Sequence, residues 1–479
     1  MEPTRNDGIS RRAALGKTAC GFAALALKGL LAEFDGLLAM PGVENPLALR
    51  PPHFTPKAKR VIFLFMHGGP SHLDTFDPKP RLDRDHGKPI PFQRSLTFSP
   101  AKELGGLMKS PFSFKQYGQS GLPVSELFPH VATCVDDLCI IRSMVGDGVD
   151  HGGAMLQLHT GSFTFTRPCM GSWVLLGLGT ENQNLPGFIT IKPTLWHGGE
   201  KNWSSSFLPG AYQGTPIGYS AMKIEDIQKQ PIEYLANARL TTEQQRYELE
   251  MLHKVNRQHA FYRELDPNLE ARIQALELAF RMQAEAPEVL EIEKESEATK
   301  KLYGLDDETT RDFGWQCLMA RRFAERGVRF IQCSHSGKEE KWDQHTKLAQ
   351  MHYKSAREVD KPIAGLLKDL KARGLLADTL VIWGGEFGRT PFAQYDGRDH
   401  NPYGFTIWIA GGGVKPGMVY GTTDEFGYHA IEQRMHIHDF HATILHLMGL
   451  DHEKLTYQYA GRNFRLTDIH GTVAHEIVA

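Results

Sequence analysis

Residue types that can bind a metal ion directly follow the first strongly apolar segment of the chain. Residues 61–66 (VIFLFM) are apolar, and the next eight residues read HGGPSHLD. His67, His72 and Asp74 supply the imidazole and carboxylate groups that zinc and other divalent transition metals take as ligands. The two glycines let the backbone approach a bound group closely. A polar loop with helix-capping residues explains this segment equally well.

The segment WDQH (342–345) carries the same residue types, shortly after a predicted strand. Asp343 and His345 would face one centre if this segment is a loop. The structural alternative is that Asp343 caps the helix that follows.

A third group lies in the glycine-rich passage that begins EFGRTP and continues to RDHNPYG. Glu386 comes just after a buried apolar run, and Asp399 and His400 follow later in the passage. Arg389 carries a planar guanidinium fork, which suits phosphate or sulfate. Acid, base and anion-binding residues crowded into one passage indicate a functional site.

The segment DGVDHGGAMLQLHTG (147–161) supplies a fourth group. Asp150 and His151 precede two glycines and a predicted helix, whose free N–H groups could bind an anion. His159 is interpreted as a histidine packed within that helix. The histidines of residues 436–441 are interpreted as caps and surface residues of another helix, not as a primary metal site.

Alternating strands and helices must position these residues. The alternation is typical of an α/β fold with a doubly wound, mostly parallel sheet flanked by helices, in which sites lie beyond the carboxyl ends of the strands. Buried strands are predicted at 59–66, 138–143, 187–192, 328–334, 378–385 and 405–410, and helices at 127–137, 311–326 and 352–374.

Residues 240–300 differ from the rest, with dense charge, almost no glycine and helical periodicity. They predict a helical insertion or arm, opened by a capping box of Thr242 and Gln245.

The N-terminus predicts export. Ser-Arg-Arg at 10–12 precedes a weakly apolar stretch at 21–27 that is interrupted by Lys28 and too short to span a bilayer. This pattern favours a twin-arginine signal in residues 1–40 over a basic amphipathic helix of the mature fold. Residues 41–58 then form an extended linker and 59–470 a single domain. The expected location is periplasmic or exported, with no stable membrane span once the signal is removed.

Composition sets further bounds. The chain has 479 residues and a formal net charge of −2, so no basic excess favours nucleic acid as a partner. None of its six cysteines forms C-x-x-C, so scattered structural thiols are the favoured interpretation. Cys134 and Cys139 could pair if the protein is exported.

Nearly the whole chain resembles a bacterial family with a twin-arginine leader, the domain of unknown function 1501. This family is placed in the alkaline phosphatase–sulfatase superfamily, whose members hydrolyse phosphate or sulfate esters at metal centres. The passages that carry the resemblance are HGGPSHLDTFDPKP, HGGAMLQLHTG, LPGFITI, WDQH, EFGRTP with RDHNPYG, and YQYAGRNFRLTD.

The resemblance implies a sulfatase-like domain and a ligand set. A metal-binding Asp of the superfamily is replaced here by His67, and a metal-binding Asp-His pair falls on Glu386 and Phe387. A further metal-binding histidine matches His400. An Asp with a nearby His matches Asp343 and, as its neighbour, His345.

This sequence differs from the superfamily pattern at the position of the nucleophile. The position of the superfamily's Ser, Thr or modified Cys falls on His151, and residues 147–157 contain none of these three types. Three groups could take the place of this nucleophile. They are water activated by the metal, His151, which could itself be phosphorylated, and Ser71. Arg389 would neutralise the anion, and Asp150, His151 or His400 would transfer protons.

We therefore expect an exported, metal-dependent hydrolase of phosphate or sulfate esters. Its cofactor would be a divalent metal ion, zinc or else calcium or manganese, and its substrate an anionic small molecule or glycan ester. A non-catalytic envelope binding protein that keeps the fold, with or without the metal, is the alternative. A purely structural exported protein is the third hypothesis. The sequence specifies no protein partner.

Overall fold

A computed structural model of the chain describes residues 45–232, 235, 239–261, 267–337 and 341–479. The predicted export signal at 1–40 and the start of the predicted linker lie outside the described residues. Two compact units are distinguished, one of which combines residues 46–238 with 267–479. The other contains residues 239–261.

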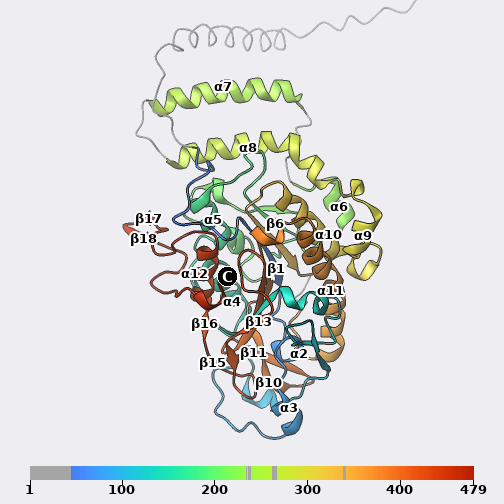
Figure 1. Cartoon of the computed structure of the whole chain (residues 1–479). Coiled ribbons are helices and arrows are strands. Elements are labelled where there is room, and N and C mark those ends of the chain that lie inside the picture. Colours follow the sequence, from blue (N-terminus) through green and yellow to red (C-terminus); the bar gives the residue numbers. More distant parts are fainter. Residues whose placement is uncertain (1–44, 233–234, 236–238, 262–266, 338–340) are drawn as a thin grey trace, which may run out of the picture. The chain divides into compact units, whose positions relative to one another are not determined.

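The larger unit is built on a mixed, mostly parallel sheet, as predicted (Figure 1). Neighbouring strands run in the order β13-β5-β12-β9-β1-β8-β6-β7, and β16 pairs with β5. Only β12 runs antiparallel to its neighbours among the described strands of this sheet. The strands are β1 (Arg60–Met66), β5 (Leu138–Val145), β6 (Phe188–Ile191), β7 (Thr215–Ile217), β8 (Phe330–His335), β9 (Thr379–Gly384), β12 (Phe405–Ala410), β13 (Met418–Tyr420) and β16 (Met435–His436).

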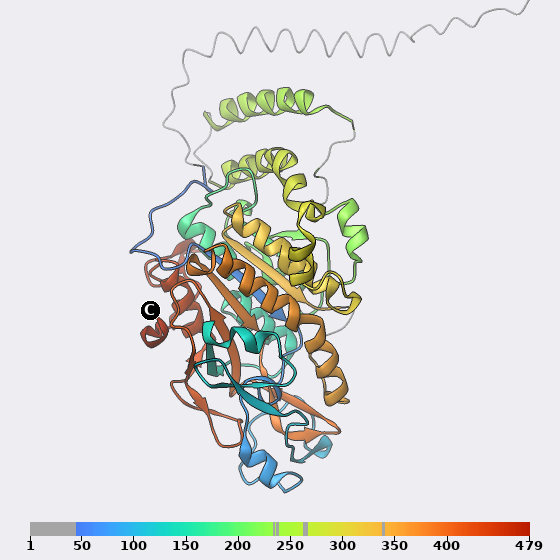
Figure 2. The ribbon, with the colours of Figure 1, turned by 45° about the vertical axis from the view of Figure 1, so that its right-hand side comes forward.

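Helices lie on both sides of this sheet (Figures 1 and 2). The helices α10 and α11 lie on one side, and α4, α5 and α12 on the other. All seven residues of β1 are therefore buried, which explains its apolar sequence on both faces. The helices of this unit are α2 (His72–Thr75), α3 (Pro80–Asp85), α4 (His151–Thr160), α5 (Met170–Leu178), α6 (Ile224–Lys229), α8 (Pro267–Leu290), α9 (Glu297–Leu302), α10 (Glu308–Glu325), α11 (Leu348–Ala372) and α12 (Ile437–Leu447).

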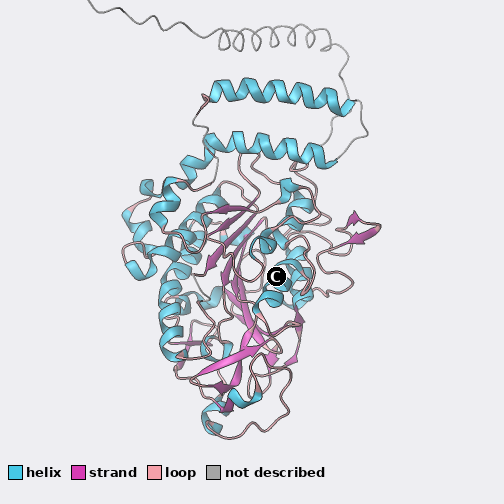
Figure 3. Ribbon diagram, turned by 180° about the vertical axis from the view of Figure 1, so that it is seen from behind, coloured by secondary structure: helices cyan, strands magenta, loops and turns pink. Residues whose placement is uncertain are grey.

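A smaller sheet was not predicted from the sequence. The glycine-rich passage after Glu386 forms a hairpin, in which β10 (Gly388–Gln394) pairs antiparallel with β11 (Gly397–Asn401). β2 (Leu104–Leu107) pairs with the other edge of β10. Figure 1 labels β10 and β11 at the lower end of the picture, and Figure 3 shows the strands there in magenta. The passage lacks the alternation of a half-buried strand because the whole of β11 and nearly all of β10 are buried. The remaining strand pairs are β3 (Phe114–Tyr117) with β4 (Leu122–Ser125), β14 (Thr422–Thr423) with β15 (Ala430–Glu432), and β17 (Tyr457–Tyr459) with β18 (Arg462–Phe464).

Two helix predictions need correction. The helix expected at 127–137 is a 3₁₀ helix confined to Val131–Asp137. In the second unit, α7 (Thr242–Phe261) is capped one residue earlier than predicted. The Thr241 hydroxyl accepts a hydrogen bond from the backbone of Gln244, and the Gln244 side chain accepts one from the backbone of Thr241. The capping box is therefore Thr241 with Gln244.

The described cysteines are all buried and free, including Cys134 and Cys139. Burial raises the pKa of Cys139 to about 12, so its thiol stays protonated. Among the helices of the described residues, none is long and apolar enough to cross a membrane.

Candidate metal centre

The carboxyl ends of three adjacent parallel strands bring the candidate residues together. β9, β1 and β8 lie side by side in the sheet. His67 follows β1, Glu386 follows β9, and Asp343 lies in the segment after β8. His400 reaches the same place from β11. The fold thus explains why residues far apart in the sequence share one site.

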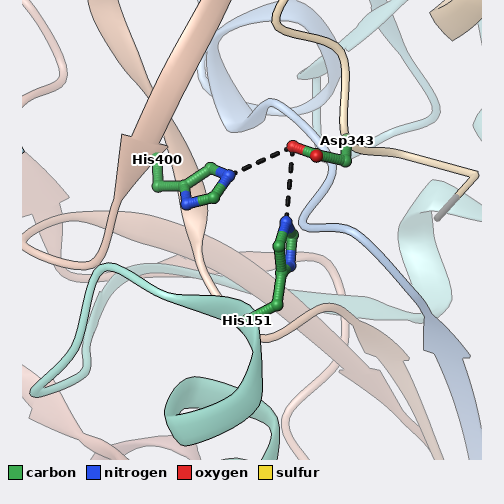
Figure 4. A group of neighbouring side chains, drawn as sticks. All are labelled: His151, Asp343 and His400. Atoms are coloured by element: carbon green, nitrogen blue, oxygen red, sulfur yellow. Dashed lines mark hydrogen bonds and ion pairs between the residues drawn. The ribbon is translucent and has the colours of Figure 1, made fainter. Parts of the chain in front are cut away.

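Asp343 is the centre of this cluster (Figure 4). Its Oδ1 atom lies 3.0 Å from His345 Nε2 and 3.1 Å from His400 Nε2. The two Nε2 atoms are 3.0 Å apart. His151 Nε2 lies 3.4 Å from the same oxygen. We refer to Asp343, His345 and His400 as the Asp343 cluster.

The outward hydrogen bonds of the two histidines leave their Nε2 lone pairs facing the carboxylate. His400 Nδ1 donates to the carbonyl of Val149 at 2.5 Å, because that oxygen can only accept. His345 Nδ1 donates to the side-chain oxygen of Gln394. Burial lowers the pKa of His400 to about 3, against the attraction of Asp343, so this ring is neutral. Two imidazole nitrogens and a carboxylate oxygen in mutual contact are a donor set that divalent transition metals take.

The geometry fits a divalent ion. Ligands at zinc distances in a tetrahedral site are about 3.3 Å apart, close to the 3.0–3.1 Å separations in the Asp343 cluster. A metal-ligating histidine usually donates its other N–H to a carbonyl or carboxylate, as His400 does to Val149. The residues present therefore suit a divalent metal ion.

His151 bridges this cluster to Glu386. Its Nδ1 lies 2.6 Å from Glu386 Oε1, while its Nε2 is buried without a hydrogen-bond partner and faces Asp343. Burial alone would lower the pKa of His151, but Asp343 and Glu386 outweigh it and raise this pKa to about 9. His151 is a cation between two carboxylates when no metal ion is bound. Glu386 is likewise buried, yet His151 and His67 lower its pKa.

A glycine packs against the backbone of the cluster. Gly68 donates its N–H to Glu386 Oε1 at 3.0 Å and has φ +111°. A Cβ atom on Gly68 would lie 2.6 Å from the backbone nitrogen of Asp343. Only glycine fits here without moving Asp343.

Replacing Gly68 by alanine is therefore expected to destabilise the fold by about 1–3 kcal/mol through backbone strain and to weaken metal binding. Gly87→Ala is the matched control, since Gly87 also has positive φ but has open space around its Cα. Urea unfolding and equilibrium dialysis with zinc would be compared for the two variants. Equal metal affinity in both would contradict the positioning role of Gly68.

A hydrogen-bonded chain from α11 holds the segment that carries Asp343. The indole N–H of Trp342 donates to His335 Nδ1 at 2.9 Å. His335 Nε2 is therefore the protonated nitrogen, and it donates to Glu358 at 2.9 Å. The Trp342 backbone N–H donates to the carbonyl of His67. This chain fixes Asp343 relative to the end of β1.

Glu358, at the end of this hydrogen-bonded series, makes a contribution to the stability of the protein that is lost in acid. Burial would raise its pKa, but His335 and Lys341 outweigh this effect and lower the pKa to about 2 from an ordinary value of 4.5. The stabilisation, about 3 kcal/mol at most, is present above pH 4.5 and is lost as the pH falls through 2. Glu358→Gln should flatten the unfolding free energy in this window, measured by urea unfolding at a series of pH values. An unchanged acid limb would show that Glu358 ionises alike in the folded and unfolded states.

Three predicted residues of the first motif are engaged away from the cluster. Asp74 forms an ion pair with Arg398, with Nε 2.8 Å from Oδ2, and neither side chain is exposed. The Ser71 hydroxyl donates to Asp74 and is fully buried, so it is not presented as a nucleophile. His72 Nε2 donates to the carbonyl of Gly427. These hydrogen bonds and this ion pair hold the loop after β1, and the side chains are directed at partners other than the Asp343 cluster.

Arg389 also has a different place from the one predicted. Its guanidinium donates to the carbonyls of Gly69, Arg398 and Trp342 and to Asp343 Oδ1 at 2.7 Å, and it is completely buried. The guanidinium therefore orients Asp343 and is not presented to a substrate anion.

Asp150 and His67 are close to the site without belonging to the Asp343 cluster. The Asp150 side chain caps α4 by accepting from the backbone of Gly153. His67 Nδ1 pairs with the Ser336 hydroxyl at 2.8 Å, and its ring contacts His151. The expectation that His67, Glu386 and His400 grip one cation is thus replaced by a different grouping. Groups of described residues whose ligand atoms all lie within 4.8 Å of one another include His151 with Asp343 and His400, and His345 with Asp399 and His400. Both groups share residues with the Asp343 cluster.

Sequence reasoning missed two residues that contact this site. The ring of His197 lies 5.0 Å from that of His151 and 5.5 Å from that of His67. Phe98 stacks on His400 with centroids 4.7 Å apart. Neither Phe98 nor His197 has a metal-binding residue type next to it in the sequence, so no local pattern indicates them.

No curated protein gives a significant match to the sequence. Similar solved structures include the lipoteichoic acid synthase LtaP from Listeria monocytogenes, with 8% identity, 88% and 78% of the two chains covered and a TM-score of 0.37. The PsFucS1 sulfatase from Pseudoalteromonas sp. has 12% identity, 83% and 68% coverage and a TM-score of 0.34. A mutant alkaline phosphatase of the Antarctic bacterium TAB5, with Mg bound in its M3 site, has 9% identity, 82% and 99% coverage and a TM-score of 0.34. Because all three TM-scores are below 0.5, no activity is transferred from them to this chain.

The family comparison covers almost all of the chain. The model that matches spans residues 58–478, which include every residue of the Asp343 cluster and the strands that position it. The chain therefore belongs to the family described as "Protein of unknown function (DUF1501)".

Proposed function

We propose that this protein is a metal-dependent hydrolase of phosphate or sulfate esters. The observation that carries the proposal is the contact of two imidazole Nε2 atoms with one carboxylate oxygen at 3.0–3.1 Å. The ester class follows from the resemblance of the sequence motifs to phosphatases and sulfatases.

Asp343, His345 and His400 would hold the ion, and His151 Nε2 faces the same oxygen as a further ligand atom. A bound divalent cation supplies Lewis acidity, which withdraws electron density from an ester oxygen or from water. Glu386 fixes the orientation of His151, because it accepts from both His151 Nδ1 and the backbone of Gly68.

The contacts of these side chains also determine which atoms can exchange protons in the site. Glu386 accepts at Nδ1 of His151, so only His151 Nε2 can exchange a proton with a group in the site. Asp343 and His345, with side chains 21% and 22% exposed, are the members of the cluster that solvent and substrate can reach. Arg389 holds Asp343 in its ionised form, since its charge opposes the burial that would raise the pKa of this carboxyl.

The lack of a hydroxyl or thiol nucleophile favours direct attack by water. In the described part of the chain, no Ser, Thr or Cys side chain is hydrogen-bonded to the Asp343 cluster or to His151. The same observation favours a second candidate, a metal-containing binding protein without catalysis. Export through a twin-arginine signal in residues 1–40 belongs to this proposal as well, because the folded, metal-loaded state suits that route.

The test is purification of the full chain without chelator, followed by metal analysis and assay of para-nitrophenyl phosphate and sulfate. We expect a bound divalent metal and hydrolysis that chelation abolishes. His345→Ala and Glu386→Gln should remove activity, whereas His86→Gln, an exposed histidine on a different loop, should leave it unchanged. Bound metal without turnover of either ester would favour the binding protein, and no bound metal would reject both.

A further inference from the structure

Five aromatic rings form a row across the candidate site in which each ring contacts the next, and we call this row the file. Trp196 lies 6.3 Å from His197 between ring centroids, and His197 lies 5.0 Å from His151. His151 lies 4.5 Å from His400, and His400 lies 4.7 Å from Phe98. The three imidazoles in the middle belong to or contact the metal site. The two ends of the file are a tryptophan and a phenylalanine.

Both ends of the file are exposed to solvent, and each carries a leucine beside its ring. Phe98 is 54% exposed and Leu96 72%, while Trp196 is 52% exposed and Leu195 57%. We call Leu96 with Phe98 the Phe98 pad, and Leu195 with Trp196 the Trp196 pad. Large apolar side chains that stay exposed at a buried polar site indicate a surface that binds a ligand.

The loop of the Phe98 pad is anchored, so the exposure of its side chains is built into the fold. Ser99 donates its N–H to Asp399 Oδ2 at 3.0 Å and its hydroxyl to Oδ1 at 3.2 Å. The Tyr403 hydroxyl donates to the carbonyl of Leu96 at 2.8 Å. Asp399 is the neighbour of His400 on β11, so the pad and the metal ligand share one support.

The loop of the Trp196 pad is anchored in the same manner. Trp196 donates its N–H to the Thr194 hydroxyl at 3.1 Å. The carbonyl of His197 accepts from the Asn202 side chain, also at 3.1 Å. The ring of His197 therefore stays against His151 while Trp196 is held in solvent.

We propose that the site takes an extended anionic ester, an oligosaccharide whose sulfate or phosphate group reaches the Asp343 cluster while one sugar ring stacks on each pad. This inference rests on the proposed function. The apolar C–H face of a sugar ring packs well on an aromatic face, and a single aryl ester would supply only one such ring. Three imidazole rings lie between the Phe98 pad and the Trp196 pad. One sugar ring therefore cannot stack on both pads, and each pad needs a separate sugar ring.

The test uses the metal-loaded full chain and probes with different numbers of rings. A sulfated chondroitin hexasaccharide and a phosphorylated mannan hexasaccharide are compared with the para-nitrophenyl esters and with inorganic sulfate and phosphate. Binding is measured by calorimetry and by the change in tryptophan fluorescence. We expect one of the hexasaccharides to bind at least about tenfold more tightly than the matching para-nitrophenyl ester. Phe98→Ala and Trp196→Ala should each weaken that binding about tenfold and leave the affinity for the inorganic anion unchanged.

Controls separate stacking from a structural effect. Phe165→Ala removes a phenylalanine that is 66% exposed and has no ring contact with the site among the described residues, and it should change nothing. Phe98→Leu keeps an apolar contact with His400 but no ring, so it should retain the bound metal and still lose hexasaccharide affinity. Loss of metal from Phe98→Ala and Phe98→Leu alike would show that the ring only supports His400, and would overturn the inference.

The remaining outcomes separate this inference from the proposed function. Hexasaccharide binding that depends on both pads, without hydrolysis, would support the inference and reject the hydrolase. Hydrolysis of para-nitrophenyl esters, with neither hexasaccharide bound more tightly than those esters, would reject the inference and leave the hydrolase standing.

Discussion

Replacing Asp343 by asparagine is expected to lower the affinity for a divalent metal by at least about 100-fold and to abolish hydrolysis. Loss of a group that only supports a ligand costs 10- to 100-fold, so loss of the ligand charge itself should cost more. The oxygen concerned lies within 3.4 Å of three histidine nitrogens. Metal retained after dialysis against zinc buffers of defined concentration measures the effect.

The Asp343→Asn variant needs a control for stability, since Arg389 loses its carboxylate partner as well. Asp396→Asn makes the same chemical change at an exposed turn of the β10–β11 hairpin and should keep wild-type metal affinity. His345→Ala leaves the Asp343–Arg389 contact in place and should still lose the metal. If the Asp343→Asn variant is folded by circular dichroism and binds zinc as the wild type does, the assignment of this site is wrong.

Breaking the buried ion pair of Asp74 and Arg398 should be the largest change in stability. Neither side chain is exposed, and Arg398 also donates to the carbonyl of Thr390 at 3.0 Å. Burial would raise the pKa of Asp74, but Arg398 outweighs it and lowers this pKa. Arg398→Met leaves a buried carboxylate without its partner, which costs about 3–5 kcal/mol. Urea unfolding in the presence of chelator measures this cost without a contribution from bound metal.

The double variant Asp74→Leu with Arg398→Met tests the electrostatic origin of that cost. Removing both charges is often close to neutral for a buried pair, so most of the lost stability should return. A double variant as unstable as Arg398→Met alone would show that packing of the Arg398 side chain, and not its charge, is what matters.

The strands of the central sheet could be predicted because burial on both faces leaves a clear signal. Continuous apolar runs such as VIFLFM correspond to β1, and the runs before Ser334 and Glu386 correspond to β8 and β9. The hairpin of β10 and β11 could not be predicted, since its residues are polar yet buried by other parts of the chain. Packing that comes from distant residues leaves no local pattern.

The sequence named residues that the structure brings close together, but it did not give their grouping. Asp343, His345 and His400 were expected as metal ligands and His151 as a catalytic residue, from their residue types and their positions after predicted strands or before a predicted helix. Arg389 was expected to bind an anion, but five hydrogen bonds to the protein occupy its guanidinium. Whether a polar side chain serves a ligand or the fold depends on its partners, which the sequence does not give.

The sequence by itself determined the class of fold, the family and the residue types available for a metal site, because apolar runs and short motifs are local properties of the chain. The tertiary structure alone decided that Asp343 is the common oxygen, that Asp74 and Arg398 neutralise each other, and that Phe98 and His197 reach the site. The physical reason is that contacts between side chains hundreds of residues apart depend on how β9, β1 and β8 align their carboxyl ends, and a local pattern does not encode that alignment.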